Sequence, residues 1–295
     1  MKVNSFILGA PKCGTTALSA YLDEHPNVCF SRPKETWYFV RNCYQEWQQR
    51  SAVNDEVYHT KFFPHFEPSL HSVIADGSPM YLQSESTIRN IVAYNPDARF
   101  VVMVRNPLTM LPSWHSQILW DRCSETEKDL EKAWYLQEQR ARGQSIPPQA
   151  KEPLELQYLS ICSLGDQIET LLKHIDRSQL LIEVFDDFKK DPLATYRRVL
   201  EHLGLPDDGR SQFPVVNDRK QHKSVLLSRV LLSLGTWRQR FIGGTSLGII
   251  NRIIRRKPAP IRMSVEFKAE LLEAFEPQIA KLENILARDL SDWRK

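Results

Sequence analysis

Phe6-Ile-Leu-Gly-Ala-Pro-Lys-Cys-Gly-Thr-Thr16 is the stretch that decides the fold, because an apolar strand runs here into a turn that suits a phosphate group. In the ATP-binding pattern GxxxxGK(S/T), Gly9 and Gly14 are correctly placed, but Thr15 stands where the lysine belongs. The lysine of this turn is Lys12 instead. Because the standard lysine reaches the terminal phosphates of a nucleoside triphosphate, the pattern indicates a different nucleotide.

The turn itself has the properties of an anion site. It lies between a strand predicted over residues 3–8 and a helix predicted over residues 15–24. Backbone N–H groups at a helix N-terminus and the helix dipole favour a phosphate or sulfate, and Lys12 adds a full positive charge. An ordinary strand-to-helix turn with incidental glycines is the alternative, because short motifs also match by chance.

Composition indicates an ordinary globular protein that buries a large core. The chain has 295 residues, of which 42% are hydrophobic and 25% are charged. A formal net charge of +3 is too small to indicate nucleic acid as a partner. Any basic function must therefore be local, at a site that gathers a few lysines and arginines.

The cysteines and the N-terminus predict a cytoplasmic protein, which we expect to be bacterial. The five cysteines are odd in number and lack CxxC spacing, which disfavours both a disulfide framework and a structural zinc site. The first strand begins at the third residue, which leaves no room for a signal peptide. No run approaches the roughly 20 apolar residues of a membrane span.

Apolar runs alternate with helical patterns along the chain. Strands are predicted over residues 3–8, 27–30, 72–75, 99–104 and 180–184, and helices over residues 15–24, 84–94, 107–120, 155–175 and 192–203. This alternation predicts an α/β fold like that of P-loop NTPases, with a parallel sheet of about five strands and helices on both faces. Functional residues in such sheets gather at the carboxyl ends of the strands.

We expect residues 1–295 to form a single domain. Residues 121–153 contain charged residues, Gly143 and the pair Pro147-Pro148, and they predict a helix-and-loop insertion near the site. Residues 225–295 are predicted to be mainly helical, with a break or kink near Pro277. The apolar and basic residues between 225 and 257 are typical of an amphipathic helix packed on the core, and contact with a membrane is the less favoured alternative.

Lys34-Glu35 follows the second predicted strand. A carboxylate beside a lysine at the mouth of an anion site can take a proton from an acceptor hydroxyl within hydrogen-bond reach. A solvated surface ion pair is the alternative. Lys34-Glu35 follows a strand end, and site residues concentrate on loops held by a rigid scaffold. We therefore give the functional interpretation and the surface ion pair equal weight.

Arg105 ends the strongest predicted strand, and Ser113 falls on the next helix about two turns from its start. An arginine fork with a nearby hydroxyl makes a good phosphate clamp. In the alternative, Arg105 caps a neighbouring helix or pairs with a carboxylate. Asp76-Gly-Ser-Pro-Met-Tyr81 also follows a strand, but its glycine and proline predict a turn in any case, so its functional signal is weak.

These motifs, in this order, resemble those of the sulfotransferases that use 3′-phosphoadenosine 5′-phosphosulfate (PAPS). Pro11-Lys-Cys-Gly-Thr-Thr16 is similar to the family's 5′-phosphosulfate loop, and Val104-Arg-Asn-Pro107 through Ser113 is similar to its 3′-phosphate motif. Arg32 to Phe39 resembles the segment that carries the catalytic glutamate in the heparan sulfate branch and its bacterial relatives. The resemblance continues through Asp76–Tyr81 and Asp187–Leu205 to the closing Asp289–Trp293, so it spans most of the chain.

The resemblance implies roles for the residues of both phosphate motifs. The 5′-phosphosulfate would be held by the loop residues Pro11, Lys12, Cys13, Gly14, Thr15 and Thr16. Arg105 and Ser113 would hold the 3′-phosphate, and a basic segment with Arg219, Lys220 and Lys223 would close over the nucleotide unless it is simply a flexible loop. The product would be 3′-phosphoadenosine 5′-phosphate (PAP), and no metal is required.

The resemblance also implies the catalytic groups. Glu35 would deprotonate the acceptor hydroxyl, while Lys12 and Lys34 would stand near the sulfuryl group. The acceptor would be a carbohydrate, a glycolipid or a small metabolite. Another branch of the family uses a histidine base, and His65 and His71 are the nearest substitutes if Glu35 is not the base, whereas we interpret His115 as structural.

Two further features of the sequence bear on the site: one difference from the heparan sulfate branch, and the position of Cys13. That branch usually has Pro-His-Phe after its glutamate, whereas this chain has Thr36-Trp37-Tyr38, which predicts a differently shaped acceptor pocket. Cys13, at a helix N-terminus, has a position that can lower the pKa of a thiol and make it reactive.

Two other functions remain as hypotheses. One is a P-loop nucleotide-dependent kinase, against which Thr15 argues, and the other is a non-catalytic nucleotide-binding protein on the same scaffold.

Overall fold

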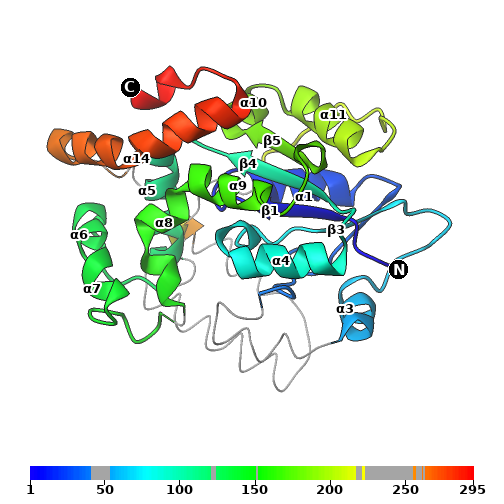
Figure 1. Ribbon diagram of the computed structural model, residues 1–295, viewed down its shortest axis with the longest axis horizontal. Helices are drawn as coiled ribbons and strands as arrows, with labels where there is room; N and C mark the ends of the chain where they lie inside the picture. The colour runs from blue at the N-terminus through cyan, green and yellow to red at the C-terminus, as the bar shows by residue number, and fades with distance from the viewer. Residues whose placement is uncertain are drawn as a thin grey trace.

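A five-stranded parallel sheet runs through the middle of the molecule (Figure 1). The computed structural model describes residues 1–40, 54–120, 124–150, 152–216, 261 and 263–295, together with the backbone of 221–222 and 255–256. The strand order is β2-β3-β1-β4-β5. The strands are β1 (Ser5–Gly9), β2 (Val28–Phe30), β3 (Val73–Asp76), β4 (Arg99–Val104) and β5 (Leu180–Val184). The predicted α/β fold with a central parallel sheet is thereby confirmed.

Helices cover this sheet on both faces, which explains why its strands are buried apolar runs. The helices are α1 (Thr15–Asp23), α3 (Asp55–Phe62), α4 (Glu85–Tyr94), α5 (Pro107–Trp120), α6 (Leu130–Tyr135), α7 (Gln137–Ala141), α8 (Tyr158–Cys162), α9 (Leu164–Leu172), α10 (Phe185–Lys190), α11 (Pro192–Leu203) and α14 (Val265–Leu286). Short 3₁₀ helices are η1 (Tyr81–Gln83), η2 (Pro153–Leu156), η3 (Arg177–Gln179) and η4 (Ser291–Arg294). A small antiparallel pair joins β6 (Gln221–His222) and β7 (Arg255–Arg256).

One predicted helix is divided. The pattern over 155–175 predicts a single helix, whereas the structure has η2, α8 and α9, with breaks at Gln157 (ψ 77°) and Ser163 (ψ 61°). The close approach of α9 to α14 requires a small residue at Gly165, because a Cβ there would lie 2.8 Å from Lys281 Cβ. The short helix α10, directly after β5, was not predicted at all.

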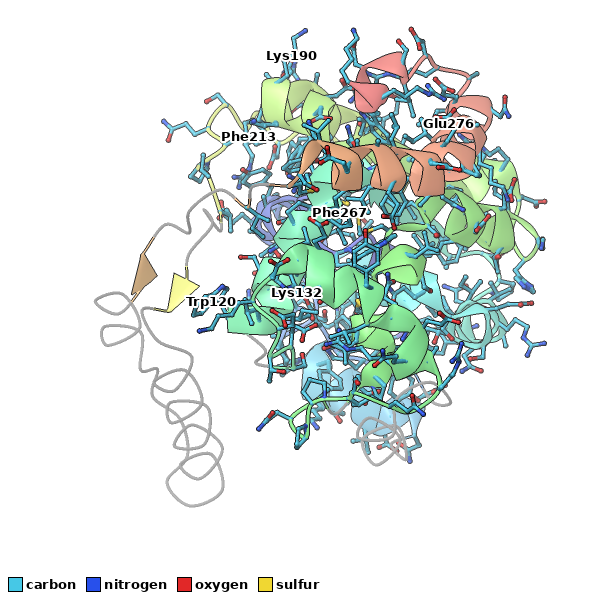
Figure 2. All side chains as sticks on the ribbon, turned by 90° about the vertical axis from the view of Figure 1, so that its left-hand side faces the viewer. Trp120, Lys132, Lys190, Phe213, Phe267 and Glu276 are labelled. Carbon is cyan, nitrogen blue, oxygen red and sulfur yellow. The ribbon has the colours of Figure 1, made fainter. Side chains whose placement is uncertain are left out.

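Of the break or kink predicted near Pro277, the break does not occur. The helix α14 continues from Val265 to Leu286 with Pro277 inside it. A proline in a helix interior costs about 3 kcal/mol. Buried residues at helical spacing offset that cost by packing against the core, and they are Phe267, Leu271, Phe275, Ile279 and Leu282. Figure 2 shows α14 lying across one face of the molecule, with Phe267 and Glu276 labelled on it.

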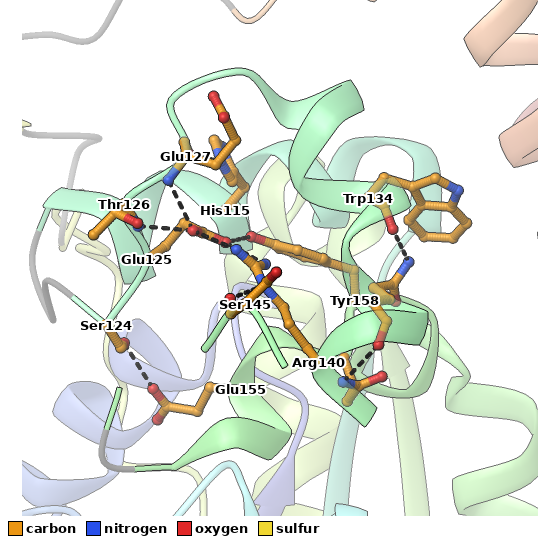
Figure 3. Close-up of polar contacts among 12 residues, drawn as sticks. His115, Ser124, Glu125, Thr126, Glu127, Trp134, Arg140, Ser145, Glu155 and Tyr158 are labelled. Carbon is orange, nitrogen blue, oxygen red and sulfur yellow. Dashed lines mark hydrogen bonds and ion pairs between the residues drawn. The ribbon is translucent and has the colours of Figure 1, made fainter. Parts of the chain in front are cut away.

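Residues 124–150 of the predicted insertion contain α6 and α7 and are held by a buried ion pair (Figure 3). Arg140 donates from both terminal nitrogens to Glu125, at 2.7 and 2.8 Å, and both side chains are almost fully buried. Tyr158 OH donates to the same carboxylate at 2.6 Å. Burial alone would raise the pKa of Glu125, but these hydrogen bonds outweigh it and hold the pKa below its usual value.

None of the helices in the described parts of the chain is both long enough and apolar enough to cross a membrane.

Candidate active site

The loop after β1 takes a conformation that requires glycine at position 14. Gly14 is left-handed, with φ 92°, and a Cβ there would lie 3.0 Å from Phe185 Cδ2 and 3.1 Å from Phe188 Cδ1. Ala10 N donates to Met103 O at 2.9 Å, which binds the start of the loop to β4. The loop therefore lies between the end of β4 and the two aromatic rings of α10.

Helix α1 begins at Thr15 without a side-chain cap. The carbonyl of Gly14 accepts from the amides of Ala17 and Leu18, so the amides before them are directed to the edge of the sheet. Thr15 is buried, Thr16 is half-buried, and Lys12 is half-buried in a left-handed conformation with φ 65°. Uncapped amides, a helix dipole and a lysine together make a site for an anionic group.

Arg105 connects the two predicted phosphate motifs directly. It follows β4, and its Nη1 donates to the backbone oxygen of Lys12 at 2.9 Å, while its Nε donates to Thr109 Oγ1 at 2.9 Å. The guanidinium lies over the Phe185 ring, 4.7 Å from its centroid. Ser113 is buried on α5, the helix that follows.

Lys34 and Glu35 lie at the same edge of the sheet. Lys34 Nζ is 3.7 Å from Glu35 Oε1, and both side chains are partly buried. Gly77 N donates to Lys34 O at 3.3 Å, which binds this segment to the turn after β3, and β3 pairs directly with β1. Burial lowers the pKa of Lys34, although the nearby charges of Glu35 and Asp76 oppose the shift.

The structure shows the environments of three residues that the sequence analysis discussed, Cys13, His115 and His71. The expectation of a reactive Cys13 is wrong, because its thiol is fully buried and burial raises its pKa to about 12. His115 is also buried, and its Nε2 donates to Glu127 O at 2.9 Å, as suits a structural residue. His71 lies just before the amino end of β3, whereas the site is built at carboxyl ends.

The role of His65 as an alternative to Glu35 as the catalytic base stays a prediction. The His65 ring lies 6.4 Å from that of His71, and burial lowers the pKa of His65. Arg219, Lys220 and Lys223, predicted to close over the nucleotide, lie outside the described residues.

Sequence reasoning missed two contributors to the site. Phe185 contacts both the loop and Arg105, but α10 is too short to produce a helical pattern. The buried carboxylate of Asp76 was given little weight, although an acidic residue at the end of an apolar strand is itself a signal of a special environment. Across the described ranges, no group of three or more His, Cys, Asp or Glu side chains is arranged to hold a metal ion.

A family model described as "Sulfotransferase family" matches residues 5–177. Membrane-associated sulfotransferase kil1 of Dictyostelium discoideum is 28% identical over 118 residues, which are 40% of this chain and 23% of that protein. Bifunctional heparan sulfate N-deacetylase/N-sulfotransferase 4 of Mus musculus is 24% identical over 296 residues, covering 97% of this chain and 30% of that protein. This chain thus spans less than a third of the length of these curated relatives.

Among solved structures, a sulfotransferase from Alicyclobacillus acidocaldarius has a similar fold. The two chains superpose with a TM-score of 0.70 and 22% identity, and the alignment covers 100% of each.

Proposed function

This chain belongs to the sulfotransferase family, and from that premise we propose that it transfers a sulfuryl group from PAPS to an acceptor hydroxyl. The observation that carries the proposal is the hydrogen bond from Arg105 to the Lys12 carbonyl, because it joins two anion-binding motifs at neighbouring strand ends. PAPS bears a phosphosulfate at one end and a 3′-phosphate at the other. Two adjoining anion sites suit such a nucleotide better than a triphosphate.

In this proposal, the residues of the two motifs divide the nucleotide between them. The amides of the 11–16 loop, the hydroxyls of Thr15 and Thr16, and the Lys12 ammonium hold the 5′-phosphosulfate. Arg105 and Ser113 hold the 3′-phosphate. Because Gly14 has no Cβ, the Phe185 ring can pack against the loop and also against the Arg105 guanidinium.

Glu35 accepts the proton of the acceptor hydroxyl, whose oxygen forms a bond to sulfur while the bond between sulfur and the 5′-phosphate oxygen breaks. Bound PAPS supplies the activated sulfuryl group, and PAP is the leaving group. Lys12 and the loop amides stabilise the charge that develops on the leaving phosphate. Lys34 places a second positive charge beside Glu35, 3.7 Å away, at the reacting end of the site.

The acceptor is proposed to be a carbohydrate or glycolipid rather than a small metabolite. The support is the similarity of the Lys34-Glu35 segment to the heparan sulfate branch, together with the names of the relatives, which refer to heparan sulfate. Those names describe N-sulfotransferases, so an amine acceptor is the competing possibility that the test must include.

We further propose that the 121–153 segment lies near the site as part of a single domain, because the Glu127 carbonyl accepts a hydrogen bond from His115 on the helix that carries Ser113. A cytoplasmic location is proposed from Cys13, Cys29 and Cys162, which are free thiols.

Transfer of labelled sulfate from PAPS to a panel of glycans, amino sugars, glycolipids and small alcohols tests the reaction. We expect Glu35→Gln to reduce turnover at least about 100-fold, the scale of a lost general base, while the affinity for PAP stays within about twofold. Glu67→Gln, at an exposed glutamate, is the matched control.

Calorimetry with PAP and with ATP, each with and without magnesium, separates the other functions. Magnesium-dependent binding of ATP in preference to PAP would favour a kinase. Binding of PAP without sulfate transfer to any acceptor class would favour a non-catalytic binding protein.

A further inference from the structure

Asp76, the last residue of β3, is a buried carboxylate that the proposed reaction does not use. It has no exposed surface. Thr36 Oγ1, Tyr58 OH and Tyr81 OH donate to its Oδ2 at 2.6, 2.8 and 3.1 Å, and Ser78 Oγ donates to Oδ1 at 3.0 Å. Burial raises the pKa of Asp76, although these hydrogen bonds oppose the shift. Hydroxyl donors on every side favour the ionised carboxylate, because a protonated oxygen would itself be a donor.

This carboxylate organises the backbone on both sides of Glu35. Thr36, the next residue, binds Asp76 through its hydroxyl, which also accepts from Tyr38 N at 3.2 Å. Ser78 Oγ accepts from the amide of Thr36 at 3.1 Å. On the other side, Lys34 O accepts from Gly77 N at 3.3 Å. The Lys34–Glu35 segment is therefore bound to the turn that follows β3.

Asp76 also contributes to the charge around Lys34. Lys34 Nζ is enclosed, 3.7 Å from Glu35 Oε1, and forms no hydrogen bond with the residues that the structure describes. Its pKa is lowered by burial and raised by the charges of Glu35 and Asp76. Among the described residues, Tyr58, Tyr81 and Tyr94 are further titratable groups near Asp76, and burial keeps all three neutral by raising their pKa values. Once Glu35 has accepted a proton, Asp76 is the carboxylate of the described residues that still acts on Lys34.

We propose that Asp76 is a positioning residue: it holds the Lys34–Glu35 segment at the edge of the sheet and supplies a negative charge from the protein that helps to retain the Lys34 ammonium while Glu35 is protonated. The inference rests on the sulfuryl transfer proposed above. It adds a role for a side chain that need not touch the nucleotide or the acceptor.

Asp76→Asn keeps the shape of the side chain and removes its charge. We expect kcat to fall about 100-fold, the scale of a reacting group displaced by about 1 Å, with the KM for PAPS unchanged. The alkaline limb of the kcat–pH profile moves to lower pH, because Lys34 loses its proton more easily without the second negative charge. Asp97→Asn, at an exposed turn before β4, is the matched control and keeps the wild-type profile.

The Asp76→Asn and Glu35→Gln variants test the role of Asp76 and the proposed function independently of each other. Wild-type kcat and an unshifted alkaline limb in Asp76→Asn overturn the role of Asp76, even where Glu35→Gln is inactive. An active Glu35→Gln enzyme overturns the function itself. If Asp76→Asn does not fold, Thr36→Val decides, because it keeps the Asp76 carboxylate and removes the Thr36 hydroxyl, with the 2.6 Å hydrogen bond that it donates to Asp76 and the one that it accepts from Tyr38 N. A kcat about tenfold lower that Thr36→Ser restores supports positioning, and a wild-type kcat in Thr36→Val overturns it.

Discussion

Gly14 and Phe185 shape the anion loop at the scale of single residues. Gly14 adopts φ 92° next to the Phe185 ring, whose centroid also lies 4.7 Å from the Arg105 guanidinium. One aromatic side chain thus supports both phosphate motifs. A side chain at position 14 would push this ring and disturb both motifs at once.

We therefore expect Gly14→Ala to destabilise the protein and weaken PAP binding. Gly143→Ala is the matched control, because Gly143 is also left-handed, at φ 79°, but a Cβ there would meet no described atom within 4 Å beyond its chain neighbours. The control should cost about 1–2 kcal/mol for the left-handed conformation. Overpacking against Phe185 and Phe188 adds roughly 1–3 kcal/mol at position 14. Urea unfolding measures both variants, and equal losses would contradict the role assigned to the rings.

At the scale of elements, the segment with α6 and α7 is joined to the core by polar contacts as well as by packing. Arg140 and Glu125 form a two-pronged buried ion pair, and Tyr158 on α8 binds the same carboxylate. Such a pair adds little net stability compared with a well-packed apolar pair, but losing one partner leaves a buried charge without compensation. The attachment of this segment therefore depends on both partners being present.

Arg140→Met is expected to lower the free energy of unfolding by about 3–5 kcal/mol, because the Glu125 carboxylate stays buried. Adding Glu125→Gln should recover most of the loss. Arg142→Met, which breaks an exposed ion pair with Glu138 on the same helix, should change stability by about 1 kcal/mol or less. The measurement is urea denaturation at neutral pH, and a loss in Arg140→Met no larger than that in Arg142→Met would disprove the assignment.

At the scale of the whole molecule, the histidines predict how stability depends on pH. Burial lowers the pKa values of His59, His65, His115 and His202. The unfolded chain, with histidine pKa values near about 6.5, then binds more protons than the folded protein as the pH falls. Stability is therefore retained above about pH 6.5 and lost progressively below it.

We expect the free energy of unfolding to fall between pH 7.5 and pH 5.5, with each such histidine contributing up to about 1.4 kcal/mol per pH unit. His115→Gln removes the titrating group while retaining a donor for the Glu127 carbonyl, so its profile should be flatter. Chemical denaturation at the two pH values tests this. A wild-type protein equally stable at both would rule out the histidine contribution.

Much of the site was predictable because it follows from local patterns. The apolar strand before Gly9, the helix after Gly14 and the strand that ends at Arg105 are each visible in a few consecutive residues. Parallel strands place their carboxyl ends at one edge, so the convergence of these motifs also followed. The position of Lys34-Glu35 at that edge was predictable for the same reason.

The sequence by itself determined the parallel sheet and the proximity of the two predicted phosphate motifs, because periodicity, turn chemistry and strand direction are local properties. Tertiary structure alone decided that Cys13 is buried with a raised pKa, that α14 continues through Pro277, and that hydroxyls from distant segments converge on Asp76. Desolvation and packing depend on neighbours far away in the chain. No window of the sequence contains those neighbours.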